Sequence, residues 1–162
     1  MASLRDLPRA LGKIHRQLVV AVAQVQTKVA FDMIVELAKA TPVATSRCQS
    51  NWFMSLTEVV PNRDFPPYHA EGQRDGPGLQ IAKQTAADAM RDLPERMVAP
   101  AARGTAPVYI GNVTPYLQYL DQGSSPQAEA NFVSQTAGAA FARATRDLPN
   151  LFGGGFNIGF RR

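Results

Sequence analysis

The stretch VYIGNVTPYLQYLDQGSSPQAEANF, residues 108–132, decides the fold because it combines a strand, a helical turn and a rigid turn. Its first residues favour a strand, which Pro115 cannot continue. Tyr116, Tyr119 and Leu120 then follow at helical spacing. A Gly-Ser-Ser-Pro turn comes before the next helical pattern. The stretch therefore predicts a strand, a compact aromatic cluster and a rigid turn in the middle of the chain.

The segment from Pro8 to about Ala40 predicts one long helix. Its apolar residues recur at steps of three or four, which places them in one stripe: Leu11, Ile14, Leu18, Val22, Val25, Val29, Met33 and Leu37. Several of these residues are β-branched, so packing must hold the helix. Pro42 disfavours helical geometry at Thr41, and the helix is expected to end there.

A half-buried strand is predicted within RCQSNWFMSLTEVV, residues 47–60. Its polar residues are expected on a solvated side, and its apolar side holds Cys48, Trp52, Met54 and Leu56. Phe53 interrupts the polar side and is expected to be covered. Residues 61–78, rich in proline and glycine, follow as a long connection. We expect this connection to lie outside the core of the folded chain.

Two more helices are predicted, at Leu79–Leu93 and at about Gln127–Arg146. The tetrapeptide RDLP closes each pattern and is expected to end the helix, because proline cannot continue it cleanly. A strand at residues 106–112 lies between the two helices. This order of elements predicts an α+β fold with a long N-terminal helix, an antiparallel sheet and helices packed on one face.

The composition is that of one ordinary globular domain. The chain has 162 residues and a net charge of +4, and a chain of this length buries roughly two thirds of its unfolded surface. The first thirty positions have one acidic residue, Asp6, and five basic residues: Arg5, Arg9, Lys13, Arg16 and Lys28. Two interpretations of them remain open, a solvated helix face and a surface that faces a polyanion.

No group of residues predicts catalysis or a cofactor. The single cysteine, Cys48, allows no internal disulfide and is expected to be a small buried residue. His15 is expected on a helix surface, and His69 has no second ligand at a diagnostic spacing. The most apolar run, residues 18–25, is too short to cross a bilayer. We therefore expect no enzyme, cofactor, metal site or membrane partner.

Two segments resemble the tail-completion, or neck, proteins of long-tailed bacteriophages, the family that includes the minor tail protein Z type. TPVATSRCQSNWFMSL, residues 41–56, is similar to the family's Thr-Pro-Val-Asp-Thr-Gly, Leu-Arg and Ser-Trp. Residues 108–132 resemble its Ile-x-Asn, Pro-Tyr, Glu-x-Gly-x-Ser and Gln-Ala-Pro-x-Gly. The order of the long helix, the strand and the late helix also matches over roughly residues 10–145.

Four residues depart from the family pattern. Ala44 and Ser46 stand where the first segment has Asp and Gly, and Glu129 and Asn131 stand where the second segment has Pro and Gly. The remaining spacing of the second segment is kept at Asp121, Gly123, Ser125 and Gln127.

The resemblance implies a structural protein of the virion at the head–tail junction, made in the host cytoplasm. It implies a homo-oligomeric ring, most simply a hexamer, that contacts adjacent neck, connector and tail proteins. Phage DNA would pass through its lumen without sequence-specific binding, and the connection at 61–78 would face a partner ring or this lumen. A tail terminator or stopper of the same apparatus, and a small basic DNA-binding module, are the alternatives. In this family arrangement Tyr116 and Leu120 would fold back onto the sheet, and residues 123–126 would turn the chain into the last helix. The structural motif and core are expected to include Pro42, Trp52, Tyr116, Tyr119, Leu120, Gly123 and Phe132.

The chain is expected to form one domain over residues 1–150 and an extended arm over residues 151–162. The arm sequence, LFGGGFNIGFRR, has glycines that disfavour a helix and apolar residues that alternate as in a strand. We expect the arm to dock on an adjacent subunit or ring rather than fray. The residues expected to carry this contact are Phe152, Phe156, Ile158, Phe160, Arg161 and Arg162.

Overall fold

The computed structural model describes residues 7–42, 46–58, 75–98, 106–124 and 129–146. Their elements, in chain order, are α1 (Leu7–Ala40), α2 (Arg47–Ser50), β1 (Trp52–Ser55), α3 (Pro77–Val98), β2 (Tyr109–Asn112), α4 (Leu117–Asp121) and α5 (Phe132–Thr145). The predicted arm and most of the connection at 61–78 lie outside the described residues.

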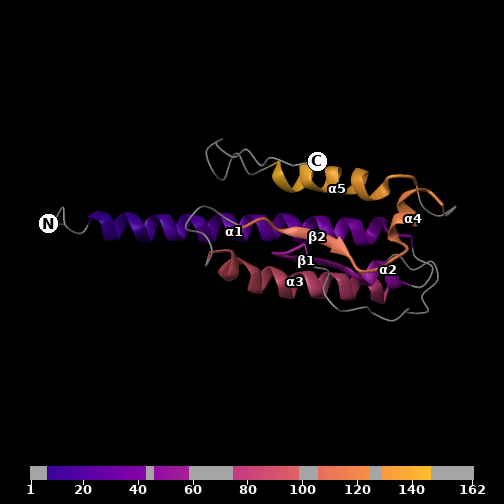
Figure 1. Ribbon diagram of the computed structural model, residues 1–162, viewed down its shortest axis with the longest axis horizontal. Coiled ribbons are helices and arrows are strands. Elements are labelled where there is room, and N and C mark those ends of the chain that lie inside the picture. The colour runs from indigo at the N-terminus through magenta and orange to yellow at the C-terminus, as the bar shows by residue number, and fades with distance from the viewer. Residues whose placement is uncertain (1–6, 43–45, 59–74, 99–105, 125–128, 147–162) are drawn as a thin grey trace.

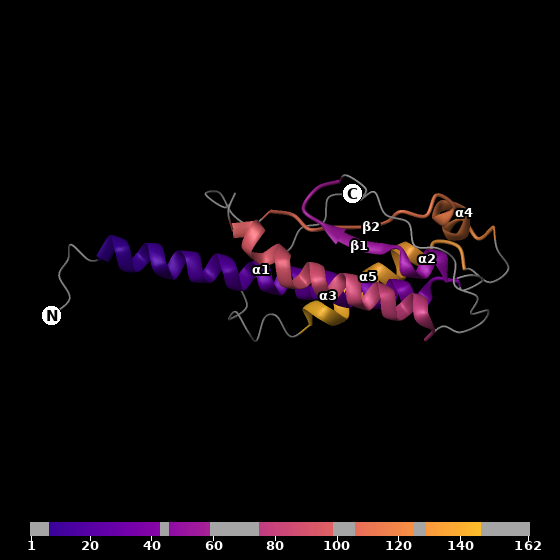
Figure 2. The same ribbon diagram turned by 90° about the horizontal axis from the view of Figure 1, so that it is seen from below.

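The helix α1 is the central element of the fold. α5 lies along one side of it, running in the opposite direction, and α3 lies along the other side (Figure 1). The two strands lie on a third side, where β1 contacts both α1 and α3 (Figure 2). α1 has 34 residues, a length of about 50 Å. Its first turns extend beyond the other helices and the strands in both views.

The two strands form an antiparallel sheet whose inner face meets the helices. Trp52 is paired with Asn112 and Met54 with Ile110, and alternate residues of a strand share one face. The buried members of the main core cluster are Ala30, Ile34, Leu37, Ala38, Trp52, Met54, Leu79, Ala82, Ala86 and Leu93. The predicted α+β class, with a long N-terminal helix and helices packed against an antiparallel sheet, is confirmed.

The ring of Phe53 covers part of the opposite face of the sheet. Phe53 is paired with Gly111, and a Cβ atom at Gly111 would come within 2.8 Å of the Phe53 ring. Because Gly111 has no side chain, the ring can lie across β2, and Phe53 is only 5% exposed. The expectation that Phe53 is covered is confirmed.

The predicted strand at 47–60 is wrong in its first part. Arg47–Ser50 form the short helix α2, and Trp52–Ser55 alone form the strand. Alternation could not separate the two structures, because Cys48 and Trp52 are four residues apart and fit a helix as well as a strand.

The helix boundaries agree with the predictions at α1 and differ at α3 and α5. α3 continues through Pro94, where it was predicted to end. A proline inside a helix removes one backbone hydrogen bond, but Leu93, Pro94 and Met97 are all buried, and this packing favours one more turn. α5 begins at Phe132 rather than near Gln127, and it ends before the last RDLP, as predicted.

The aromatic cluster is more exposed than predicted. Tyr119 is 56% exposed, which corrects its assignment to the core. Leu117 is the residue of α4 that packs against the main core cluster. Two helical positions apart correspond to a rotation of about 200°, so Tyr119 lies on the opposite side of α4 from Leu117.

Replacing Trp52 with alanine should lower the free energy of unfolding by about 3–5 kcal/mol. The indole is 2% exposed and lies between the sheet and two helices. Urea unfolding followed by circular dichroism measures the loss. Tyr119→Ala is the matched control, because it removes an exposed ring and should cost less than about 1 kcal/mol. An unchanged stability of Trp52→Ala would contradict the assigned core.

Candidate functional site

Residues 41–56 and 108–132 form one structural unit although they are far apart in the sequence. β1 comes from the first segment and β2 from the second. The side-chain amide of Asn112 donates to the Cys48 carbonyl at 2.7 Å, and the Val113 N–H donates to the Asn51 carbonyl at 3.4 Å. The second segment is therefore joined to α2 by a side-chain hydrogen bond, and to Asn51, which follows α2, by a backbone one.

Buried polar side chains fix the first segment to the C-terminal end of α1. The indole N–H of Trp52 donates to the Thr41 hydroxyl at 2.9 Å, and that hydroxyl donates to the Leu37 carbonyl at 2.7 Å. The side-chain amide of Gln49 donates to the Ala38 carbonyl at 3.0 Å. The last carbonyls of a helix lack donors within the helix. The first segment supplies side-chain donors to two carbonyls near this end of α1.

Gln49 and Asn51 are fully buried, which corrects their predicted place on a solvated side. Burying an amide is unfavourable unless it is hydrogen-bonded. The Gln49 amide has the Ala38 carbonyl as its acceptor, and the Asn51 amide donates to the Arg47 carbonyl at 2.8 Å. These bonds are what allow polar residues to occupy the interior at α2.

The second segment contains a helix cap that depends on Gly123. This residue has a φ of 75°, in the left-handed region. Its N–H donates to the Leu120 carbonyl at 3.1 Å, and the Ser124 N–H donates to the Tyr119 carbonyl at 3.1 Å. The pair of bonds is a Schellman motif, in which glycine at the left-handed position ends a helix without strain.

Asp121 connects this cap to the start of α5. Its carboxylate accepts a hydrogen bond from the Val133 N–H at 2.8 Å, and its carbonyl accepts one from the Asn131 N–H at 2.6 Å. The first N–H groups of a helix lack internal partners, and negative charge beside them is favourable. The sequence did not predict this role of Asp121. Asp121 and Val133 are 12 residues apart, and the spacing rules for helix caps link only residues within a few positions of each other.

The backbone is left-handed at two residues that are not glycine. Ser46 has a φ of 59° and Asn131 a φ of 61°, and within the described ranges no other non-glycine residue has a positive φ. Ser46 precedes α2 and Asn131 precedes α5. A left-handed conformation costs roughly 1–2 kcal/mol for an ordinary residue, and less for asparagine. Packing around both turns must therefore hold them in place.

The start of α3 approaches the turn at Ser46 closely. A Cβ atom at Gly78 would lie 2.7 Å from the Ser46 Cβ and 2.9 Å from its carbonyl oxygen. Gly78 is buried in the first turn of α3. The predicted connection at 61–78 is corrected at this end, because Gly76 and Gly78 are buried, whereas Asp75 and Pro77 are exposed. Residues 61–74 of that connection lie outside the described residues.

Ser46→Gly should raise the free energy of unfolding by about 0.5–1 kcal/mol. Glycine relieves the left-handed strain at this buried turn, and this gain exceeds the entropy cost of glycine, roughly 0.5–1 kcal/mol. Asn131→Gly should change stability little, because asparagine tolerates this conformation. Thermal unfolding of the purified variants measures both changes.

Ser134→Gly is the matched control for these variants, because Ser134 is exposed within α5. There the same substitution should destabilise by about 1 kcal/mol or less. A loss of stability for Ser46→Gly as large as that of the control would show that the turn is not strained.

The thiol of Cys48 is unsuited to nucleophilic chemistry. Cys48 is buried in α2, and this burial raises the pKa of the thiol to about 12, while a hydrogen bond with Thr114 opposes the rise. A cysteine nucleophile reacts as the thiolate, which this pKa disfavours at neutral pH. Cys48 is a small buried residue, as predicted, although it lies on a helix rather than on a strand.

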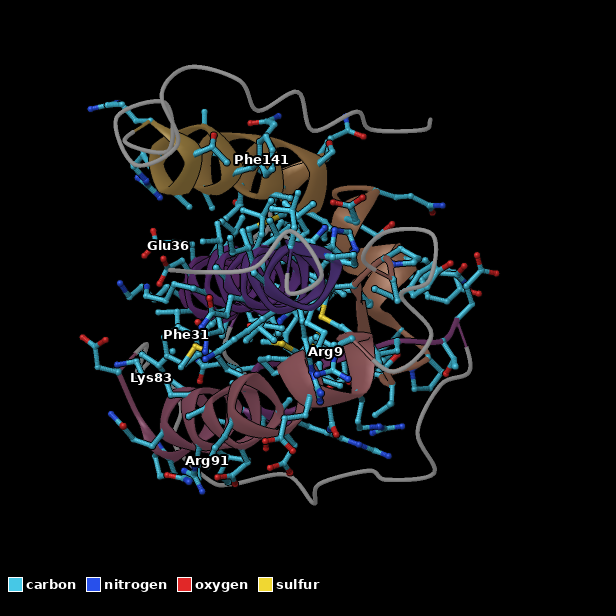
Figure 3. All side chains as sticks on the ribbon, turned by 90° about the vertical axis from the view of Figure 1, so that its left-hand side faces the viewer. Arg9, Phe31, Glu36, Lys83, Arg91 and Phe141 are labelled. Carbon is cyan, nitrogen blue, oxygen red and sulfur yellow. The ribbon has the colours of Figure 1, made fainter. Side chains whose placement is uncertain are left out.

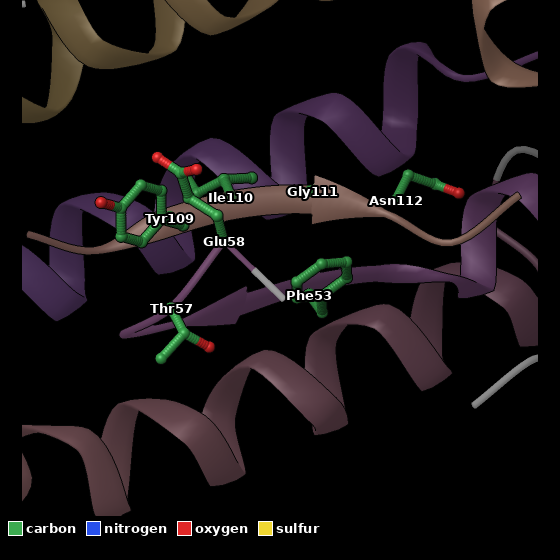
Figure 4. A pocket seen from close by; sticks show the side chains of 7 residues that line it. All are labelled: Phe53, Thr57, Glu58, Tyr109, Ile110, Gly111 and Asn112. Atoms are coloured by element: carbon green, nitrogen blue, oxygen red, sulfur yellow. The ribbon is translucent and has the colours of Figure 1, made fainter. Parts of the chain in front are cut away.

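A hollow of about 220 Å³ lies beside the outer face of the sheet (Figure 4). Its lining residues are Phe53, Thr57, Glu58, Tyr109, Ile110, Gly111 and Asn112. The lining combines aromatic and aliphatic carbon with one carboxylate, one phenol, one aliphatic hydroxyl and one amide. Histidine and cysteine, which commonly act as bases and nucleophiles, are absent from this lining.

An ion pair joins α5 to α1 on the surface, and a second pair lies beside it within α1. Glu36 of α1 is 2.7 Å from the Arg143 guanidinium of α5 and 2.8 Å from the Lys39 ammonium. The hydrogen bond from Lys39 is the largest cause that lowers the pKa of Glu36, and Arg143 adds to it. Figure 3, which looks along α1 from its N-terminal end, shows Phe141 on α5 and Arg91 on α3 on opposite sides of α1.

The N-terminal part of α1 has both a basic and an apolar surface. Arg9, Lys13 and Arg16 are exposed, and the sequence has no acidic residue between Leu7 and Phe31. By length and composition alone, α1 is the one helix among the described residues that could cross a membrane. Core helices meet the same criterion, and the second half of α1 is packed against α3, β1 and α5.

Among the described residues, the histidine and acidic side chains form no metal-binding group. His15 is exposed on α1, and His69 lies outside the described residues. In the portions of the chain that the structure describes, no three histidine, cysteine, aspartate or glutamate side chains are placed to hold a metal ion.

The residues expected to form the structural motif have different environments. Trp52 and Phe132 are buried, Pro42, Tyr116 and Leu120 are half-buried, and Tyr119 and Gly123 are exposed. The six residues expected to carry the arm contact lie outside the described part of the chain. No protein-family model, curated protein or solved structure matches this chain.

Proposed function

We propose that this chain is a structural subunit of the neck of a long-tailed bacteriophage, of the tail-completion type, and that it forms a ring at the head–tail junction. Its partners are then other copies of itself, most simply in a hexamer, and the adjacent neck, connector and tail proteins. Phage DNA passes through the lumen without being read. No chemical step is assigned to any residue.

One observation carries this proposal. The family pattern has glycine at three positions, which correspond to Ser46, Gly123 and Asn131, and the backbone is left-handed at all three. Residues other than glycine rarely adopt a positive φ. Ser46 and Asn131 stand where the family pattern has glycine, and they are the two non-glycine residues of the described chain with a positive φ. Because both keep the conformation that glycine favours, this agreement supports a shared local fold.

The contacts between the two segments give a second support. Residues 41–56 and 108–132 are paired as β1 and β2 and joined by the bond from Asn112 to Cys48. Three residues of the family pattern act in folding: Trp52 fills the core, Gly123 ends α4, and Asp121 caps α5. A protein whose distinctive residues build the fold is suited to a structural role.

The shape of the fold is also suited to a ring. Cyclic assembly with head-to-tail contacts joins two unlike surfaces of neighbouring subunits. α1 extends beyond the other elements at one end, while α2, α4 and the start of α5 lie near its other end (Figure 1). The subunit therefore presents different surfaces along its long axis.

Electron cryo-microscopy of virions produced from the genome that encodes this chain tests the proposal. We expect a closed ring of copies at the head–tail joint. Particles made without the protein should give separate heads and tails, and adding the purified protein should join them. Trp52→Ala, added in the same way, is the control for the need of a folded subunit. Virions with one copy, or with none at the joint, would contradict the proposal.

A basic DNA-binding module is the second candidate, favoured by the exposed face of Arg9, Lys13 and Arg16. Binding carried by these residues should weaken steeply with salt. Replacing all three with glutamine should then reduce the slope of log K against log salt by up to about 3.

A matched control replaces three cations of α3, Lys83, Arg91 and Arg96, with glutamine. Fluorescence anisotropy with DNA duplexes of two unrelated sequences measures both slopes. Tight binding that prefers one sequence would favour the DNA-binding module. Weak binding that ignores sequence is what a channel lining requires.

A further inference from the structure

An apolar stripe is exposed at the N-terminal end of α1. It consists of Leu7, Leu11, Ile14 and Leu18, which are between 52% and 60% exposed. Their spacing of three and four residues places them on one face of the helix. The cations Arg9, Lys13 and Arg16 lie on the opposite face by the same periodicity. Four large aliphatic side chains in a row exceed the scattered exposure that is normal for a protein surface.

Further along α1, the same face of the helix is covered by α5, and we call this contact the α1–α5 seam. Val25, Val29 and Met33 follow at the same spacing and pack against α5, through Ala140 and Phe141. α5 runs antiparallel to α1, so the end of α5 points toward the exposed stripe (Figure 1). The seam loses its cover at the residue where α5 ends, Thr145.

The sequence that follows α5 has the length and composition to cover the rest of the seam. The distance along α1 from Val25 to Leu7 is about 27 Å at the helical rise. The sixteen residues 147–162 can span up to roughly 53 Å when extended. Pro149 prevents a simple continuation of α5. The large apolar residues of this segment are Leu148, Leu151, Phe152, Phe156, Ile158 and Phe160.

Pairing of the stripe with the same stripe of a second copy is the less favourable arrangement. Burying roughly 100 Å² for each of four side chains on two copies gives on the order of 800 Å². Stable interfaces bury about 1,200–2,000 Å². A segment of the same chain needs no such area, because its docking costs no translational entropy and benefits from a high effective concentration.

We propose that residues 147–162 dock along the stripe formed by Leu7, Leu11, Ile14 and Leu18 of α1 in the same chain. The segment extends the α1–α5 seam, and its apolar side chains contact the stripe. Docking on a neighbouring subunit, the expectation from sequence alone, is the competing arrangement. The inference goes beyond the proposed function and does not depend on it, because it concerns the isolated subunit.

Cross-linking of the full chain tests the proposal. Asn157→Cys is combined with Ala10→Cys, which flanks the stripe, or with Arg9→Cys, which lies on the opposite face. A bismaleimide reagent with a span of about 8 Å should join the first pair at least fivefold faster than the second. The product should be monomeric and its rate independent of protein concentration. The wild-type chain, whose Cys48 is buried, is the control for background reaction.

Equal rates for the two cysteine pairs would overturn the proposal, because an undocked segment reaches both faces of α1 alike. Dimeric products whose rate rises with protein concentration would also overturn it, and would place the segment on a neighbouring subunit. Neither result would bear on the ring at the head–tail joint, which is tested by imaging.

A second comparison separates docking from mere proximity of the chain end. Phe156→Asp, Ile158→Asp and Phe160→Asp together should reduce the rate for the Ala10→Cys pair to that of the Arg9→Cys pair. The matched control adds the same three charges at glycines, as Gly153→Asp, Gly155→Asp and Gly159→Asp, and should keep most of the preference. Equal preference in both triple variants would show that the apolar side chains do not hold the segment.

Discussion

The hydrogen bond from the Trp52 indole to the Thr41 hydroxyl is the contact on which the rest of the structure depends. Trp52 is a fully buried large side chain, and a buried indole N–H needs an acceptor. Thr41 can supply it because Pro42 ends α1 at this point and because its own hydroxyl proton goes to the Leu37 carbonyl. One bond thus places β1 against the end of α1. β1 then positions β2, and the second segment continues from β2 into α4 and α5.

Long-range periodicity made some elements predictable. The apolar pattern from Leu11 to Leu37 has eight members at consistent spacing, so a helix is the structure that fits it, and the bounds of α1 were predicted nearly to the residue. The short elements have no such redundancy. At Cys48 and Trp52 the same two apolar residues fit a helix and a strand. The choice of α2 is made by tertiary bonds such as that of Gln49 to the Ala38 carbonyl, and no local sequence signal reports them. Pro94 shows the same effect, because burial of the last turn of α3 outweighs a local preference.

The candidate site was predictable in its location and not in its roles. Segments 41–56 and 108–132 were selected from the sequence, and they do meet in space. Tyr119, the most conspicuous residue of the second segment, is exposed, whereas Asp121 makes the connection to α5. The left-handed backbone at Ser46 and Asn131 was also beyond sequence reasoning. Serine and asparagine fit many conformations, so the identity of a residue does not reveal that its neighbours force a rare one.

The wide separation of the two strands has a consequence for the order of folding on the ribosome. The bond from Asn112 to Cys48 spans 64 residues, and contacts between distant residues slow folding because a long loop must close first. α1 and α3 can pair as soon as residue 98 has emerged, but β1 has no partner strand until residue 112 follows. The face of α1 that packs against α5 stays exposed longer still, because α5 ends at Thr145. A nascent chain therefore exposes the inner surface of an incomplete core for several seconds at ordinary rates of synthesis, and exposed apolar surface of this kind favours aggregation.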